Sequence, residues 1–246
     1  MRRCFVTPTF IVTFVLFFSS ISNASPTAFY IKKEKANKTA YYIAAMIVAG
    51  RGVIAKHQSL LNDPSIGNKN FTPEYVQKCI LKNFKKITGT ALFDVDPDIK
   101  TVLDQVLKAA KMSVQMNQRR INRKGVKFKG YIPAVFGREV GMILKYKSNI
   151  SLKQASLRYR NIYNQPDPFE RRVLLKFESQ ERTKGQGYGE FRNGFYRYLH
   201  PIYIKKVCLK CHGEPAGELD PTGRKKEGYK EGDLRGAISI AFPYSE

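Results

Sequence analysis

The chain has 246 residues, 43% of them hydrophobic, and a formal net charge of +23 at pH 7. This apolar content is enough for a real core, and the length suits one large domain, or one domain with a helical extension. A charge this high often accompanies nucleic-acid binding. Here the basic residues are scattered in short pairs and the chain carries an export signal, which together argue against that class. An acidic redox partner or an anionic membrane surface suits an exported basic protein better, and an ordinary solvated surface is the alternative.

The N-terminus has the three parts of a secretory signal peptide. Arg2 and Arg3 make it positive, an apolar run spans residues 10–18, and Ser22-Asn23-Ala24 is a small-x-small cleavage site. The apolar run is too short to cross a bilayer. We therefore expect residues 1–24 to be removed and the mature protein to be periplasmic or otherwise exported. An uncleaved membrane anchor is the alternative.

Helical periodicity dominates residues 25–124, which we expect to form an N-terminal helical region. The pattern predicts helices over residues 39–61, 72–88 and 97–123, and a shorter helix over 130–147 follows. Thr72 and Pro73 are typical of a helix start, and Gly89 is typical of a helix end. His57 falls on the apolar face of the first helix, where a structural role in the core is the usual meaning. Cys79 lies beside the buried stripe of the second helix.

Strand patterns dominate the second half of the chain. We expect strands over residues 151–159, 195–204 and 234–242, a helix over 169–182, a glycine-rich hairpin turn at 185–189 and a polar loop over 214–233. The strand at 195–204 is rich in aromatic residues and leads directly into the most distinctive motif. Helices come first and short strands later, with one helix between them, and this order predicts an α+β fold.

Cys208, Cys211 and His212 form a CxxCH sequence, the attachment motif of a c-type heme. Each thiol forms a thioether with one heme vinyl group, and one helical turn between the cysteines places both sulfurs along one porphyrin edge. The histidine then lies beneath the ring as the proximal iron ligand. The motif therefore predicts one covalently bound heme c. Two alternatives are half of a zinc site, for which the chain has no second ligand pair, and a thioredoxin-like redox pair within a βαβ unit.

Three segments around this motif share a pattern that extends well beyond it. They are Arg158-Tyr159-Arg160-Asn161 with Asn164-Gln165-Pro166-Asp167-Pro168-Phe169-Glu170, then Tyr198 to Gly213, and Gly232-Asp233-Leu234-Arg235-Gly236-Ala237-Ile238-Ser239. In this order they resemble a bacterial family of single-heme c-type proteins that was long catalogued as a domain of unknown function. The resemblance implies a PAS-like antiparallel sheet over residues 125–246, preceded by the N-terminal helices and holding the heme. Members occur alone or fused to histidine kinases and chemoreceptors, which implies sensing.

Arg158 and Arg160 are predicted to bind the heme propionates, because they lie in the strand that leads into the first of these segments. An arginine fork can bind a carboxylate through two parallel hydrogen bonds. The alternative is that both arginines pair with Asp167 or Glu170 and brace the loop.

The second axial ligand of the iron is the least determined part of the site. Some members of the family use a cysteine thiolate in a helix before the first segment, but the corresponding position here falls near Phe128. Cys79 and His57 are the distal candidates from the N-terminal helices, and His200 and Met142 are further alternatives. An iron that stays open to water or to a small gas is the remaining hypothesis.

These features favour an exported heme protein that senses redox state or a gas through its iron. The alternative is a periplasmic electron-transfer cytochrome that docks to acidic partners. The expected partners are a redox protein or a separate signalling protein, and not a nucleic acid. An enzyme such as a peroxidase is less favoured, because it requires distal acid–base groups and the chain has only three histidines.

Overall fold

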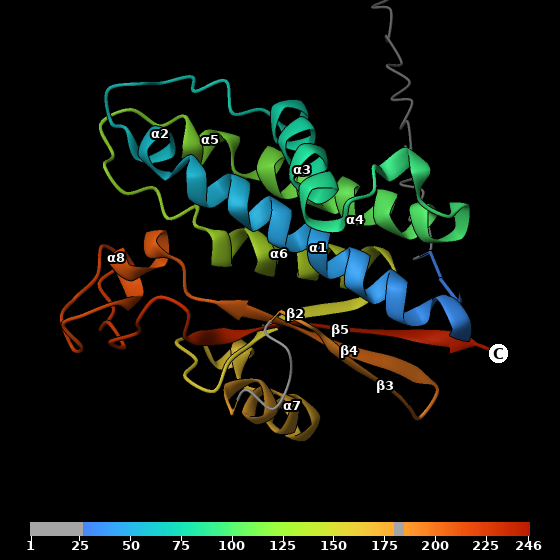
Figure 1. Cartoon of the computed structure of the whole chain (residues 1–246). Helices are drawn as coiled ribbons and strands as arrows, with labels where there is room; N and C mark the ends of the chain where they lie inside the picture. The colour runs from blue at the N-terminus through green and yellow to red at the C-terminus, as the bar shows by residue number, and fades with distance from the viewer. Residues whose placement is uncertain (1–26, 180–184) are drawn as a thin grey trace, which may run out of the picture.

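A layer of helices covers one face of a five-stranded sheet, and a single helix lies on the other face (Figure 1). The structure is a computed structural model that describes residues 27–179 and 185–246. The predicted signal peptide lies outside the described residues. A short turn of helix stands at one end of the sheet, beyond the last residue of one central strand and before the first residue of its neighbour.

The helical layer contains α1 (Ala36–Lys56), α2 (Gln58–Asn62), α3 (Pro73–Thr88), α4 (Pro97–Met116), α5 (Gln118–Ile121) and α6 (Pro133–Lys147). Thr72 caps α3 by accepting a hydrogen bond from the backbone of Tyr75 at 3.1 Å, and Gly89 ends it with a φ of 74°. Both ends of this helix are therefore where the sequence predicts them. Within the described residues, no helix has both the length and the apolar character needed to cross a bilayer.

Two predicted helices are each divided into a long and a short piece. The first begins at Ala36, earlier than expected, and is interrupted at His57, while the third is interrupted at Asn117. At both positions the side chain contacts the backbone carbonyl four residues earlier, at 2.8 Å from His57 to Val53 and at 2.8 Å from Asn117 to Ser113. Such bonds compete with the helical hydrogen-bond ladder, and at both residues the backbone has left the helical conformation, with ψ of 10° at His57 and 1° at Asn117.

The sheet contains β1 (Ile31–Lys32), β2 (Ser151–Ala155), β3 (Tyr188–Arg192), β4 (Phe195–Tyr203) and β5 (Leu234–Ser245). The order is β1-β5-β4-β3, and β2 pairs with the same central strand β5. The short β1 runs parallel to β5 and every other pairing is antiparallel, so the sheet is mixed. The predicted α+β class, with N-terminal helices before the sheet, is confirmed. Helix α7 (Pro168–Glu178) covers the face opposite the helical layer (Figure 1).

Strand β3 differs from the sequence prediction, which placed a hairpin turn at residues 185–189. The turn instead lies at Asn193 and Gly194, whose φ angles are 50° and 76°. An Asn-Gly pair with positive φ at both residues is the favoured two-residue hairpin turn, since its twist matches that of the flanking strands. The residues at 188–192 are therefore a strand that pairs with β4.

One hydrophobic core joins the helical layer to the sheet. Alternate residues of β4, such as Tyr196 and Tyr198, are buried toward α1, together with Ile238 and Ile240 of β5. The opposite face of β4 contributes Leu199 to a smaller core beneath α7. Asn37 donates a hydrogen bond to the Tyr196 hydroxyl at 2.7 Å, which fixes the start of α1 over the sheet. Residues from both sides of position 125 share the larger core.

Gly141 marks the closest approach between a helix and the sheet, and it supports a stability prediction. A Cβ at Gly141 would stand 2.3 Å from the carbonyl oxygen of Leu152 in β2, whereas a Cβ at Gly52 of α1 would meet nothing within 4 Å. We expect Gly141→Ala to lower the free energy of unfolding by about 1–3 kcal/mol through overpacking. Gly52→Ala should raise it by about 0.5–1 kcal/mol, because alanine loses less backbone entropy in a helix. Urea unfolding of both variants measures the difference, and equal stabilities would contradict the packing of α6 on β2.

Candidate cofactor site

The CxxCH motif forms the turn at the end of the sheet, between β4 and β5. Cys208 ends a short 3-10 helix, η4 (Lys206–Cys208), and Cys211 and His212 belong to α8 (Leu209–His212). The backbone of Ile204 donates to the Asp233 carbonyl at 2.8 Å and accepts from Gly232 at 2.9 Å, which ties the start of the turn to the start of β5. The three motif residues are thus held on one turn.

The two thiols are free and partly exposed. Burial, followed by the charge of Asp220, raises the pKa of the Cys211 thiol. A redox-active pair of the thioredoxin type has a lowered thiol pKa and follows a strand in a βαβ unit. The turn here instead lies between antiparallel strands. Geometry and electrostatics therefore both disfavour that alternative.

His212 is oriented by a carboxylate from the following loop. Its Nδ1 lies 2.9 Å from Oε2 of Glu227, and its backbone carbonyl accepts a hydrogen bond from Tyr229 at 2.9 Å. An ionised carboxylate can only accept, so Nδ1 carries the proton and Nε2 keeps its lone pair. Burial and then the charge of Arg235 lower the pKa of His212, although Glu227 raises it. The imidazole is therefore neutral at ordinary pH, and the lone pair of Nε2 is available to a metal.

Arg160, a predicted propionate ligand, is bonded to the protein itself. Its guanidinium donates to Asp220 at 2.5 Å, to both carboxylate oxygens of Glu227 at 2.5 and 2.7 Å, and to the Cys211 carbonyl at 2.6 Å. Burial alone would raise the pKa of Glu227, but the hydrogen bonds from Arg160 and His212 outweigh it and lower that pKa. Arg160 therefore connects the loop that carries Asp220 and Glu227 to the CxxCH motif. The sequence suggested Asp167 or Glu170 as its partners instead.

Arg158, the second predicted propionate ligand, lies over the ring of Tyr229 at 4.1 Å from its centroid. Arg235 lies 5.6 Å from the same ring and donates to the Ser156 hydroxyl at 2.8 Å. The Tyr229 ring in turn meets His212 edge-on at 6.4 Å. The Tyr229 ring therefore links His212 to Arg158 and Arg235.

A further arginine approaches the motif from the helical layer. Arg51 of α1 donates to the Pro133 carbonyl at 3.2 Å, and it makes no ion pair with any described residue. Burial, followed by the charge of Arg235, lowers the pKa of Arg51 to about 10, while Cys208 raises it. These influences place Arg51 within the electrostatic reach of both the motif and Arg235.

The distal candidates Cys79 and His57 both belong to the helical layer, Cys79 within α3 and His57 at the junction of α1 and α2. Both ring nitrogens of His57 are occupied, at 2.8 Å from the Val53 carbonyl and 2.8 Å from the Tyr75 hydroxyl. Cys79 of α3 packs against the core of that layer. The contacts of both side chains in the described residues are with the helices and with the core beneath them.

His200 and Met142 occupy contrasting environments. Met142 is 65% exposed on α6. His200 lies on the face of β4 that turns toward α1, with its ring 6.0 Å from that of Tyr41. Its Nδ1 is the one buried side-chain nitrogen or oxygen without a hydrogen-bond partner among residues 27–179 and 185–246. Burial lowers the pKa of His200, so the ring is neutral and Nδ1 is a latent polar contact for a bound group.

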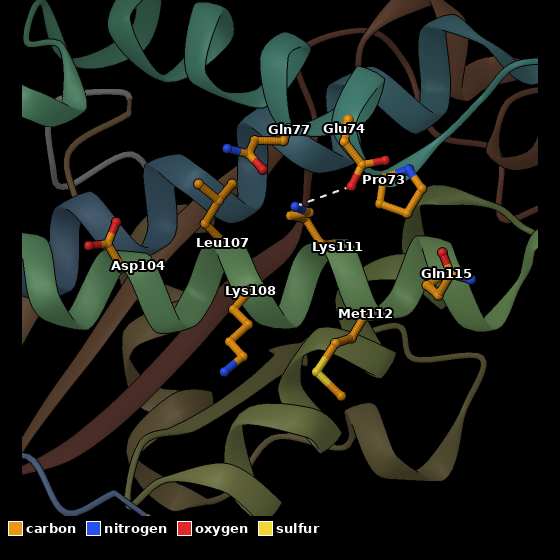
Figure 2. Close-up of a pocket in the computed structure, with 9 residues that line it drawn as sticks. All are labelled: Pro73, Glu74, Gln77, Asp104, Leu107, Lys108, Lys111, Met112 and Gln115. Carbon is orange, nitrogen blue, oxygen red and sulfur yellow. Dashed lines mark ion pairs between the residues drawn. The ribbon is translucent and has the colours of Figure 1, made fainter.

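The remaining candidate sites are a metal-ion cluster and a surface groove. No cluster of three or more His, Cys, Asp and Glu side chains in the described residues has the geometry to hold a bare metal ion. A groove of about 420 Å³ runs between α3 and α4, where Lys111 pairs with Glu74 at 3.3 Å (Figure 2). None of the predicted site residues lines this groove.

Sequence reasoning missed three residues of the site: Arg51, Glu227 and Arg235. Glu227 lies in a loop without periodicity, and only the fold brings it to His212. Arg235 stands within the Gly-Asp-Leu-Arg-Gly segment that carries the resemblance, so its position in that segment was an available indication. Arg51 interrupts an otherwise apolar helix, which is a weaker indication of the same kind.

Fold and site together define an α+β protein in which one end of the sheet carries two free thiols and a histidine oriented by Glu227. The chain belongs to the Tll0287-like family, whose model matches residues 31–243 and so includes the helical layer as well as the sheet. A solved structure described as the cyanobacterial heme-protein Tll0287 is similar, with 18% identity and a TM-score of 0.42. That match covers 62% of this chain and 99% of the solved one. A search of curated proteins gave no match.

Proposed function

We propose that this protein binds one heme covalently through Cys208 and Cys211, with His212 as the proximal iron ligand. One observation carries the proposal: two free thiols share a turn with a histidine whose Nδ1 is bound to Glu227, which leaves Nε2 for a metal. Family membership supports it, because the protein Tll0287 is described as a heme protein.

The surrounding residues fit the chemical character of heme. Heme carries two anionic propionates, and Arg51 is a partly buried cation without an ion-pair partner among the described residues. His200 offers a buried Nδ1 that no described group satisfies. A buried cation or polar atom lowers the stability of the fold unless it forms an ion pair or a hydrogen bond with a partner. A bound heme would supply an iron centre for electron exchange and for binding small gases.

The chain's own residues would perform four tasks around such a group. The thiols of Cys208 and Cys211 hold it, and the Nε2 of His212 binds the metal. Glu227 keeps the imidazole in one tautomer and orientation. Arg51 supplies positive charge toward the propionates, in addition to the sequence-predicted Arg158.

We infer a sensing or redox-relay role for this heme, with an iron whose sixth position is open or exchangeable. The bonds of His57 support this, since its ring nitrogens already contact the Val53 carbonyl and the Tyr75 hydroxyl, and iron binding would break one of these contacts. The alternative is an electron carrier, which needs two fixed ligands. The unpartnered Nδ1 of His200 favours that alternative, because no hydrogen bond from a described residue competes for this buried donor atom.

Export and partner choice belong to the same proposal. The signal-peptide pattern supports an exported protein, and heme of the c type is attached outside the bacterial cytoplasm. The net charge of +23 supports docking to an acidic redox or signalling protein, with an anionic membrane surface as the other candidate.

The test is expression in a host that exports and matures c-type cytochromes. The chain should retain heme on a denaturing gel stained for peroxidase activity, at one heme per chain. After reduction, rapid binding of carbon monoxide would support the open iron and hence sensing. If the wild type is low-spin and does not bind carbon monoxide, and the His200→Ala variant does bind it, the result would support the electron carrier. A chain without heme stain in this host would contradict the proposal as a whole.

A further inference from the structure

Glu227 is the carboxylate that contacts the proposed proximal ligand. Its Oε2 lies 2.9 Å from Nδ1 of His212, and its side chain is only 14% exposed. A histidine that donates its second ring N–H to a carboxylate is a stronger electron donor to a metal than one that donates to a neutral group. The charge on this residue therefore reaches the metal-binding nitrogen through the imidazole ring.

The position of Glu227 is fixed by two arginines. Arg160 binds both carboxylate oxygens, at 2.5 and 2.7 Å, and also donates to the carbonyl of Cys211 at 2.6 Å. Arg235 approaches Oε1 at 3.6 Å. Because Arg160 joins the carboxylate to the backbone of the motif, Glu227 and His212 are held in a single rigid unit. The arginines also withdraw part of the negative charge, so the donation to His212 is moderate.

We propose that Glu227 is a positioning residue that orients His212 and lowers the reduction potential of the metal bound to it. This inference rests on the proposed heme function. The sign follows from charge: an anion next to the imidazole stabilises the ferric state, which carries one more positive charge than the ferrous state.

Glu227→Gln tests the inference, since glutamine retains the shape and one acceptor oxygen but loses the charge. We expect the covalent heme content to equal that of the wild type. At a fixed solution potential, the ratio of ferric to ferrous heme should fall about tenfold. This change corresponds to a midpoint potential that is about 59 mV higher for a one-electron couple. The iron–histidine stretching frequency in the resonance Raman spectrum of the reduced protein should fall, because the imidazole donates less.

Asp220→Asn is the matched control. Asp220 also binds Arg160, at 2.5 Å, and its side chain is fully buried, but it does not contact His212. Its variant should leave the iron–histidine frequency unchanged and shift the potential less than Glu227→Gln does. Equal shifts in both variants, or no shift in Glu227→Gln, would overturn the inference.

If Glu227→Gln does not fold, a measurement on the wild type still tests the inference. The Nδ1 proton of His212 should exchange slowly with solvent in the NMR spectrum, because it is buried in a bond to a carboxylate. Rapid exchange would overturn the inference. A wild-type chain without heme would instead refute the proposed function, so the two failures have different signatures.

Discussion

Replacing Cys208 and Cys211 together with alanine is expected to remove all covalently bound heme from the chain. Each thiol supplies one thioether, and no third described cysteine lies on the turn that carries them. Each single variant should retain heme through the remaining thioether, with a shifted absorbance spectrum because one vinyl group stays unreacted. Heme staining of denaturing gels and intact mass spectrometry measure the attachment directly.

Cys79→Ala is the control for this experiment. Cys79 lies in α3 within the helical layer, so its variant should stain like the wild type. Staining of the double variant at the wild-type level would show that the heme is attached elsewhere. Loss of stain in Cys79→Ala would instead give that thiol a role at the site, and it would contradict the placement of α3.

The parts of the fold that the sequence predicts well are those whose determinants lie close together in the chain. Helix α3 is an example, since Thr72, Pro73 and Gly89 act within a few residues of the ends that they define. The CxxCH turn is another, because the spacing of the motif is itself the geometry of one helical turn. Local chemistry decides such features, and tertiary contacts do not alter them.

The residues that contact the motif from other segments of the chain were not predictable in this way. Arg160 and Glu227 are 67 residues apart in sequence, and only the docking of the loop at the end of the sheet brings them together. Sequence reasoning could identify Arg160 as a charged residue in a notable segment, but the identity of its carboxylate partner depends on long-range packing. The same limit applies to β3, whose half-exposed residues show no clear alternation and whose turn is indicated only by Asn193 and Gly194.

Arg160→Ala is expected to cause the largest loss of stability among single substitutions near the site. The side chain of Arg160 is 15% exposed, and it pairs with Asp220, which is fully buried, and Glu227, which is 14% exposed. Its removal leaves two buried carboxylates without their main cation. Breaking a buried pair in this way costs about 3–5 kcal/mol in the free energy of unfolding. Chemical unfolding monitored by circular dichroism measures the loss.

Two further variants separate the charge from its geometry. Arg160→Lys retains the charge but cannot bind both carboxylates with a planar fork, so it should recover only part of the lost stability. Arg172→Ala removes a similar pair, in which the arginine donates to Glu190 at 2.9 Å, but both side chains there are partly exposed to water. Such an exposed pair contributes less than about 1 kcal/mol. A loss in Arg160→Ala no larger than that in Arg172→Ala would contradict the buried network.

The pH dependence of this loss tests whether the paired carboxylates are responsible, and Asp220 gives the expected direction. Burial would raise the pKa of Asp220, but hydrogen bonds from Thr222, Arg224 and Arg160 outweigh it and bring the pKa to about 2. Because the folded pKa lies below the unfolded value of about 3.9, this group stabilises the fold above that value and loses its contribution as the pH falls toward 2. Without Arg160 the folded pKa moves back toward the unfolded one. The destabilisation by Arg160→Ala should therefore be full at neutral pH and shrink between about pH 4 and pH 2, whereas a loss independent of pH would point to packing alone.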